Sequence, residues 1–285
     1  ELWDVHDGIV GVPLDPARWT FCASQITALG QCAFKWFAQR RLRLGELEEA
    51  EEEVSPLVRG SIYHRTLEIA LSRARDAEDV RAAALENLEA AFAEAEAGEG
   101  IPRQASWPMR RQHHLEVLRR VLRAEDFFTP EGEIVSLEES FEGTWRGLRV
   151  RGIVDRVDLG LDGLVLLDYK TRANMPVGAK SSSGKADLDV QLPLYVETAA
   201  QALHPGEPVA GARYYSLTKA KVIAEATINE GELTALVERV QGHLEAGAYP
   251  VDPDLKQDAC GYCDFDLVCR MGPRIERKRQ GGDEG

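Results

Sequence analysis

The stretch that most constrains the fold is GIVDRVDLGLDGLVLLDYKT, residues 152–171. Two short apolar runs flank a Gly-Leu-Asp-Gly turn, and this pattern predicts a β-hairpin. If the turn spans 160–163, the register places Asp155 directly opposite Asp168, with Cβ atoms roughly 4.5–5.5 Å apart. Lys170 follows Asp168 by two residues and therefore shares its face of the strand. The hairpin thus gathers two acids and one amine.

Facing carboxylates repel each other across a sheet, so this arrangement needs a compensating positive charge. A divalent cation is one source, because carboxylate oxygens are the ligands that Mg²⁺ and Mn²⁺ prefer. The lysine would add a third charge, placed to meet an anionic substrate. The pattern leaves one alternative open, in which these residues form the solvent-facing polar side of an edge hairpin.

Helical periodicity precedes the hairpin, and strands alternate with helices after it. We expect one mixed α/β domain in which helices flank a central mixed sheet. Its parts are a lead-in segment (1–20), a helical region (57–130), a catalytic core (133–248) and a tail (273–285). The expected helices are 24–41 with a Ser24 cap, 57–75, 78–97, 108–127, 188–203 and 230–246. The expected strands are 133–141, 144–159, 163–170, 210–217 and 221–228.

Composition indicates an ordinary globular chain, with 285 residues of which 44% are hydrophobic. No apolar run approaches the ~18 residues that span a bilayer, and no signal pattern is present, so we expect a soluble, cytoplasmic protein without a membrane partner. A net charge of −14 argues against nucleic acid as a partner. Many acids, however, concentrate in the expected linker 46–53, and basic residues cluster elsewhere, so charge excludes nothing here. A chain that begins at Glu1 fits a piece of a longer polypeptide.

The five cysteines point to a metal centre. Cys260, Cys263 and Cys269 form a C-x2-C-x5-C pattern, and such spacing lets one loop offer several thiolates to one metal. An odd count without a secretory signal disfavours a disulfide framework. A fourth ligand must come from far along the chain, and Cys32 is a better candidate than Cys22, which we expect to be a small buried residue. Zinc is the alternative for any four-cysteine set.

Asp155, followed on the next strand by Asp168-Tyr169-Lys170, resembles the core of the PD-(D/E)XK nuclease superfamily. The resemblance implies the restriction-endonuclease-like fold and a Mg²⁺ or Mn²⁺ ion held by the two carboxylates. It also implies that Lys170 orients or activates the attacking water.

Two further stretches carry the resemblance. RGSIYHRTLE is similar to the family segment G-x-x-x-H-x-x-L-E, whose histidine, here His64, joins the metal site. VQLPLY resembles the Q-x-x-x-Y motif of RecB-type nucleases. Gln191 and Tyr195 share one helix face at this spacing and are expected to reach DNA or the metal-site groups. The implied metal ligands are His64, Asp155, Asp168 and the backbone carbonyl of Tyr169.

A distant cysteine followed by C-x2-C-x5-C is similar to the iron–sulfur staple of AddB-type nuclease domains and of CRISPR-associated RecB-family exonucleases. The resemblance implies a structural 4Fe–4S cluster that joins segments 21–45 and 249–272. FCASQITALGQCAFKW also resembles the AddB pattern, with Ala33 where that family usually has proline. WDVHDGIV looks like the segment that precedes the AddB nuclease domain. The implied cluster ligands are Cys32, Cys260, Cys263 and Cys269.

The resemblance implies a metal-dependent DNA exonuclease or nuclease that processes DNA ends in recombinational repair. Its expected partners are single-stranded or frayed DNA ends and a helicase domain or subunit. The alternative is a catalytically idle, nuclease-like DNA-binding subunit of a helicase–nuclease complex. GAKSSSGKA is not a P-loop, because five residues separate Gly178 from Gly184 and Ala186 follows Lys185. The stretch is better explained as a loop near the active face.

Overall fold

The computed structural model describes residues 8–16, 18–45, 54–99, 106–171, 188–254, 259–260 and 263–269. The expected linker 46–53 and most of the loop that contains GAKSSSGKA lie outside these residues, as do the two ends of the chain. Within the described residues, no helix combines the length and the apolar character that crossing a membrane requires.

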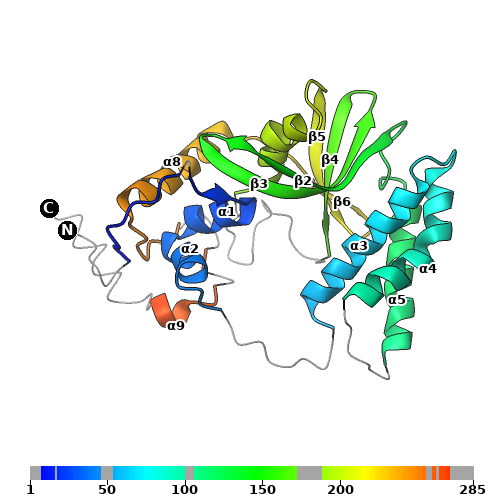
Figure 1. The fold of residues 1–285 in the computed structure, drawn as a ribbon, viewed down its shortest axis with the longest axis horizontal. Helices are drawn as coiled ribbons and strands as arrows, with labels where there is room; N and C mark the ends of the chain where they lie inside the picture. The colour runs from blue at the N-terminus through cyan, green and yellow to red at the C-terminus, as the bar shows by residue number, and fades with distance from the viewer. Residues whose placement is uncertain are drawn as a thin grey trace.

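A mixed six-stranded sheet forms the centre of the molecule (Figure 1). Strand β3 pairs antiparallel with β2 and β4, and parallel with the short β1. Strand β4 then pairs parallel with β5, which forms an antiparallel pair with β6. The predicted mixed sheet is therefore confirmed. The strands are β1 (Thr20–Phe21), β2 (Glu133–Trp145), β3 (Leu148–Gly160), β4 (Gly163–Lys170), β5 (Val209–Ser216) and β6 (Lys221–Glu225).

Two helical layers cover the two faces of the sheet, each over its own apolar core. On one side lie α3 (Pro56–Ala74), α4 (Val80–Gly98) and α5 (Trp107–Arg123). The other side carries α1 (Ala23–Gln31), α2 (Ala33–Arg40), α6 (Gln191–Leu194), a π-helix (Tyr195–Ala199), α7 (Ala200–Leu203) and α8 (Glu230–Ala246). The short α9 (Asp266–Cys269) follows in the C-terminal segment.

Strand β4 shows how the sheet separates the two cores. Leu164 and Leu166 enter the core beneath α1 and α8, whereas Val165 and Leu167 enter the core beneath α3 to α5. Side chains alternate along a strand. Asp168 therefore continues the first series and faces the layer that contains α6.

The predicted register of the β3–β4 hairpin is confirmed. Pairing runs from Gly160 with Gly163 to Arg156 with Leu167 around a two-residue turn, 161–162. Gly163 adopts a φ of +118°, and a Cβ there would lie 2.3 Å from a backbone oxygen. The turn therefore requires glycine, and it fixes which residues of the two strands face each other.

The predicted position of the β2–β3 turn was wrong. We expected it near residues 142–143, but it falls at Arg146 and Gly147, both with positive φ (+48° and +83°). A two-residue turn with two left-handed residues matches the right-handed twist of a hairpin. Both strands are consequently thirteen residues long.

Two predicted helices are interrupted. The expected helix 24–41 divides into α1 and α2, because Cys32 is extended (φ −159°, ψ 111°), and α1 is capped by Cys22 rather than by Ser24. The expected helix 188–203 begins at Gln191 and contains the π-helical turn that starts at Tyr195. Both irregularities fall at residues that the sequence had singled out for function.

Candidate active site

The site lies where β3 and β4 part. Their ladder ends at Arg156 and Leu167, one step before the two aspartates. There the Tyr169 amide donates to Asp155 Oδ2 at 2.5 Å. On the free edge of β3, the carbonyl of Ile153 accepts a hydrogen bond of 2.7 Å from the Tyr195 hydroxyl. Side chains thus satisfy buried backbone groups that the ladder leaves unpaired.

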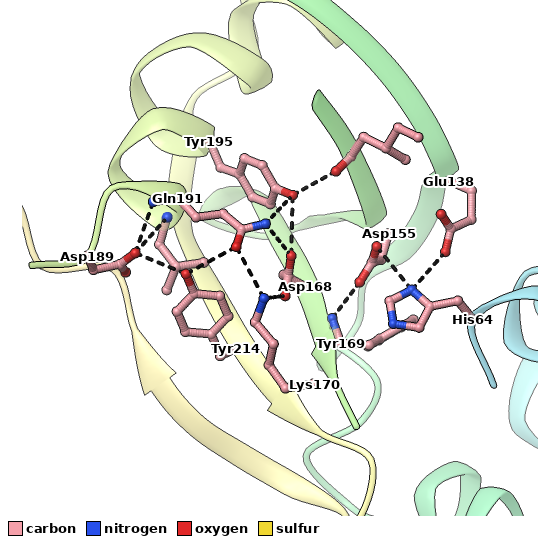
Figure 2. Close-up of polar contacts among 12 residues, drawn as sticks. His64, Glu138, Asp155, Asp168, Tyr169, Lys170, Asp189, Gln191, Tyr195 and Tyr214 are labelled. Atoms are coloured by element: carbon pink, nitrogen blue, oxygen red, sulfur yellow. Dashed lines mark hydrogen bonds and ion pairs between the residues drawn. The ribbon is translucent and has the colours of Figure 1, made fainter. Parts of the chain in front are cut away.

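Asp168 is held by three partners, as Figure 2 shows. Lys170 Nζ lies 2.6 Å from Asp168 Oδ2, and Gln191 Nε2 donates to Oδ1 at 2.5 Å. The hydroxyl of Tyr195, which donates its one proton to Ile153, lies 3.3 Å from Oδ1 and accepts from Gln191 Nε2 at 2.9 Å. The predicted shared face of Gln191 and Tyr195 is therefore confirmed. These contacts stabilise a carboxylate in a residue that is only 5% exposed.

The ammonium of Lys170 is oriented as firmly as the carboxylate. It donates to Gln191 Oε1 at 3.1 Å and lies 4.7 Å from the centre of the Tyr214 ring. Tyr214 in turn donates to Asp189 Oδ1 at 2.9 Å, and the same carboxylate oxygen accepts from the backbone N–H of Gln191. Burial raises the pKa of Asp189. Residues at the start of α6 and on strand β5 therefore act together to fix the position of the lysine ammonium.

A second cluster adjoins the first. His64, on α3, places Nδ1 3.3 Å from Asp155 Oδ1 and 3.3 Å from Glu138 Oε1 (Figure 2). Burial lowers the pKa of His64, but the two carboxylates outweigh it and raise this pKa to about 10. Burial, followed by the negative charge of Asp168, raises the pKa of Asp155 to about 6. A proton on His64 would have to leave before its Nδ1 could bind a metal.

These side chains fit a divalent metal ion. Three side chains, those of His64, Glu138 and Asp155, each offer one ligand atom, and these three atoms all lie within 4.8 Å of one another. Carboxylate oxygens suit Mg²⁺ and Mn²⁺, and an imidazole nitrogen can complete such a site. Among the described residues, no other group of three or more histidine, cysteine or acidic side chains brings its ligand atoms this close together. The four predicted cysteine ligands do not form a group that compact.

The comparison with protein families agrees with this geometry. Residues 20–270 match the model of the PD-(D/E)XK nuclease superfamily. The chain belongs to this superfamily. A search of curated proteins finds no match. Membership indicates metal-dependent nuclease activity.

Glu138 is the residue of this PD-(D/E)XK site that the sequence analysis missed. Strand β2 pairs with β3 on both sides of it, Leu137 with Arg156 and Glu139 with Val154, so Glu138 stands opposite Asp155. Its φ of +46° is rare for a residue other than glycine. Such a conformation costs about 1–3 kcal/mol and is concentrated at functional sites. A correctly placed β2–β3 turn would have revealed this pairing.

Tyr169 was predicted to offer its backbone carbonyl to the metal, and this ligation stays a prediction. Its amide binds Asp155, and its ring lies in the opposite core, 5.7 Å from the His64 ring. Burial raises the pKa of Tyr169. The tyrosine thus positions the hairpin and the histidine at once.

The predicted cluster ligands come from two distant parts of the chain. Cys32 is buried between α1 and α2, whereas Cys260, Cys263 and Cys269 lie in the C-terminal segment. The pKa of Cys32 is raised to about 11, mainly by burial and to a smaller extent by negative charge on Cys263 and Cys260. Those two thiols therefore lie within electrostatic range of Cys32. The expectation that Cys22 is buried is wrong: this fifth cysteine is only half-buried, because it is the N-cap residue of α1, and its Sγ lies 3.2 Å from Ser24 Oγ.

Residues just before the C-terminal cysteines are attached to the α1–α2 region. The ring of Tyr249 stacks on Phe37 with centroids 5.1 Å apart. The Pro250 carbonyl accepts from the Phe34 amide at 3.2 Å, and the Asp254 amide donates to the backbone of α1 at 2.7 Å. The structure therefore joins the two segments that the sequence predicted to meet.

Proposed function

We propose that this chain is a metal-dependent deoxyribonuclease that hydrolyses phosphodiester bonds. The observation that carries the proposal is the placement of His64, Glu138 and Asp155 within 4.8 Å of one another, beside the Asp168–Lys170 ion pair. The PD-(D/E)XK superfamily supports hydrolysis of a nucleic acid.

The side chains have separate roles in this proposal. When bound, a divalent cation would polarise the phosphate and lower the pKa of water. His64, Glu138 and Asp155 would hold it, with Asp168 on the adjacent strand. Lys170 would orient the attacking water and offset negative charge on the phosphate. Gln191 and Tyr195 act on Lys170 and Asp168 through the hydrogen bonds described above.

We further propose that the substrate is a single-stranded or frayed DNA end, processed during recombinational repair with a helicase domain or subunit. The similarity of the His64 and Gln191 segments to RecB-type nucleases supports this choice. The competing possibility is an idle DNA-binding subunit. The presence of every expected acid, the histidine and the lysine in two adjoining clusters favours catalysis.

Cleavage of end-labelled single-stranded DNA tests the proposed function. We expect Mg²⁺- or Mn²⁺-dependent cleavage that EDTA abolishes. Lys170→Ala should slow it about 10²–10³-fold, because a positioned charge beside the phosphate is lost. The side chain of Lys170 is 33% exposed, so the variant should fold. Lys221→Ala, which removes an exposed lysine from β6, is the matched control. Cleavage at the parental rate by purified Lys170→Ala would refute the mechanism.

We also propose that Cys32, Cys260, Cys263 and Cys269 hold a structural 4Fe–4S cluster. Two observations support it: the electrostatic proximity of Cys32 to the two C-terminal thiols, and the attachment of residues 249–254 to α1 and α2. Thiolates are the ligands for both iron–sulfur clusters and zinc, so metal content must decide.

Cys263→Ser should lower stability and remove the visible iron–sulfur absorption band. A lost structural metal releases the C-terminal segment, because binding of such a metal contributes directly to folding. The measurements are iron, sulfide and zinc content together with thermal unfolding, and Cys22→Ser provides the control. A native protein that contains zinc and no iron would overturn the iron–sulfur assignment.

A further inference from the structure

A polar cleft of about 420 Å³ opens beside the active site. Its floor includes Gln191 and Tyr214, two of the residues that contact the Lys170 ammonium. Its wall is formed by one face of α1 and α2, whose lining residues recur every three or four positions from Ala23 to Arg40. The cleft is therefore continuous with the site and is built from a different part of the chain.

The cleft carries unpaired positive charge. Lys35 and Arg40 line it, and neither makes an ion pair within the described part of the chain. Asp189 is the acid among the described lining residues, and the Tyr214 hydroxyl and backbone amides already bind it. Many arginines elsewhere are paired with glutamates or aspartates. With one acid against two cations, the described residues that line the cleft carry a net positive charge beside the active site, although the whole chain has a net charge of −14.

The wall also offers neutral hydrogen-bonding groups. The side chain of Gln31 lines the cleft, the residue is 5% exposed, and this side chain has no hydrogen-bond partner among the described residues. Ser24 and Gln39 line the same wall. Amide and hydroxyl groups on this wall can hydrogen-bond the oxygens of a polar ligand.

We propose that this cleft binds the sugar–phosphate backbone of an unpaired nucleic-acid strand and leads it to the reacting phosphate. Lys35 and Arg40 contact phosphates, while the neutral side chains contact sugar or phosphate oxygens. This inference rests on the proposed function. Proteins that hold single strands use such a positively charged groove along the backbone.

The size of the cleft selects one strand. Its volume of about 420 Å³ falls within the about 300–1,000 Å³ of pockets that hold one small molecule. A duplex presents two backbones across a major groove ≈ 12 Å wide, which a cleft of this size does not enclose. An unpaired strand is therefore the substrate form that fits.

The test is the double variant Lys35→Gln with Arg40→Gln, which keeps much of each side chain and removes both charges. Binding of a fluorescent single-stranded oligonucleotide is measured in EDTA over a range of salt concentrations. We expect affinity to fall on the order of 10-fold and the salt slope to decrease by about 1.4, since each phosphate contact on a single strand contributes about 0.7. Arg75→Gln with Arg123→Gln removes two exposed arginines outside the cleft and is the control.

Cleavage kinetics separate this inference from the proposed function. We expect the double variant to raise KM and to keep kcat, and the parent to bind a blunt duplex more weakly than a single strand. An unchanged salt slope, a loss of kcat alone, or equal affinity for duplex would overturn the cleft assignment even if the enzyme cleaves DNA. A parent that binds single strands with this slope and cleaves nothing would instead overturn the nuclease proposal. Circular dichroism of the variant checks its fold.

Discussion

Asp168→Asn is expected to reduce DNA cleavage about 10³-fold, the upper range for removing one preorganised electrostatic group. The change is isosteric, so Gln191 and Tyr195 keep a neighbour of the same shape. It removes the negative charge that faces the metal site and pairs with Lys170 at 2.6 Å. The rate of end-labelled DNA cleavage at saturating Mg²⁺ measures the loss.

The same variant has a second readout that does not depend on activity. The charge of Asp168 contributes to raising the pKa of Asp155 from 3.8 to about 6. An acid whose pKa is raised by folding makes the native state less stable as pH rises from about 4 to about 6, because the unfolded chain loses its proton first. In Asp168→Asn the pKa of Asp155 should fall, and this decline in stability should shrink.

Asp162→Asn is the matched control for that experiment, because Asp162 lies exposed in the turn of the same hairpin. Urea unfolding across this pH window and NMR titration of Asp155 report the shift. If Asp168→Asn cleaves DNA as fast as Asp162→Asn does, Asp168 is no part of the catalytic centre. An unchanged titration of Asp155 would show that the two carboxylates do not interact.

The hairpin of β3 and β4 could be read from the sequence because its pattern is local. A glycine-bounded turn set the register, and the register brought Asp155 and Asp168 together at the edge of the ladder. What the pattern did not show is that the strands separate at that step. At this step Tyr195, 42 residues further along the chain, binds the β3 backbone at Ile153, and nothing local to the hairpin reveals that contact.

The sequence did not reveal the role of Glu138, because an error of a few residues in the position of one turn changes every pairing in a long hairpin. With the turn at Arg146 and Gly147, Glu138 falls opposite Asp155. Its left-handed backbone follows no sequence preference, since glutamate rarely adopts it. The break at Cys32 was equally hidden, because AFKW continues a helical pattern and only the position of the C-terminal segment requires an extended residue there.

Asp158→Asn should destabilise the protein by about 3–5 kcal/mol, the usual cost of breaking a buried ion pair. Arg156 is fully buried, and its Nε lies 2.9 Å from Asp158 Oδ1. The guanidinium also donates to the Phe127 carbonyl and lies 4.5 Å from the Phe127 ring centre. Thr129 donates to the carboxylate at 2.7 Å. An amide would leave the guanidinium charge uncompensated in the core beneath α3 to α5.

A paired replacement separates the cost of an orphaned charge from the value of the pair itself. Arg156→Met with Asp158→Leu removes both ions, and such exchanges are often neutral or stabilising where one broken partner is not. We therefore expect urea unfolding to show the double variant closer to the parent than Asp158→Asn is. If Asp158→Asn cost no more than the exposed Asp162→Asn, the guanidinium would have to be compensated by the Phe127 carbonyl and ring alone. The part of β3 that carries Asp155, the residue directly before Arg156, would then owe its position to apolar packing rather than to the ion pair.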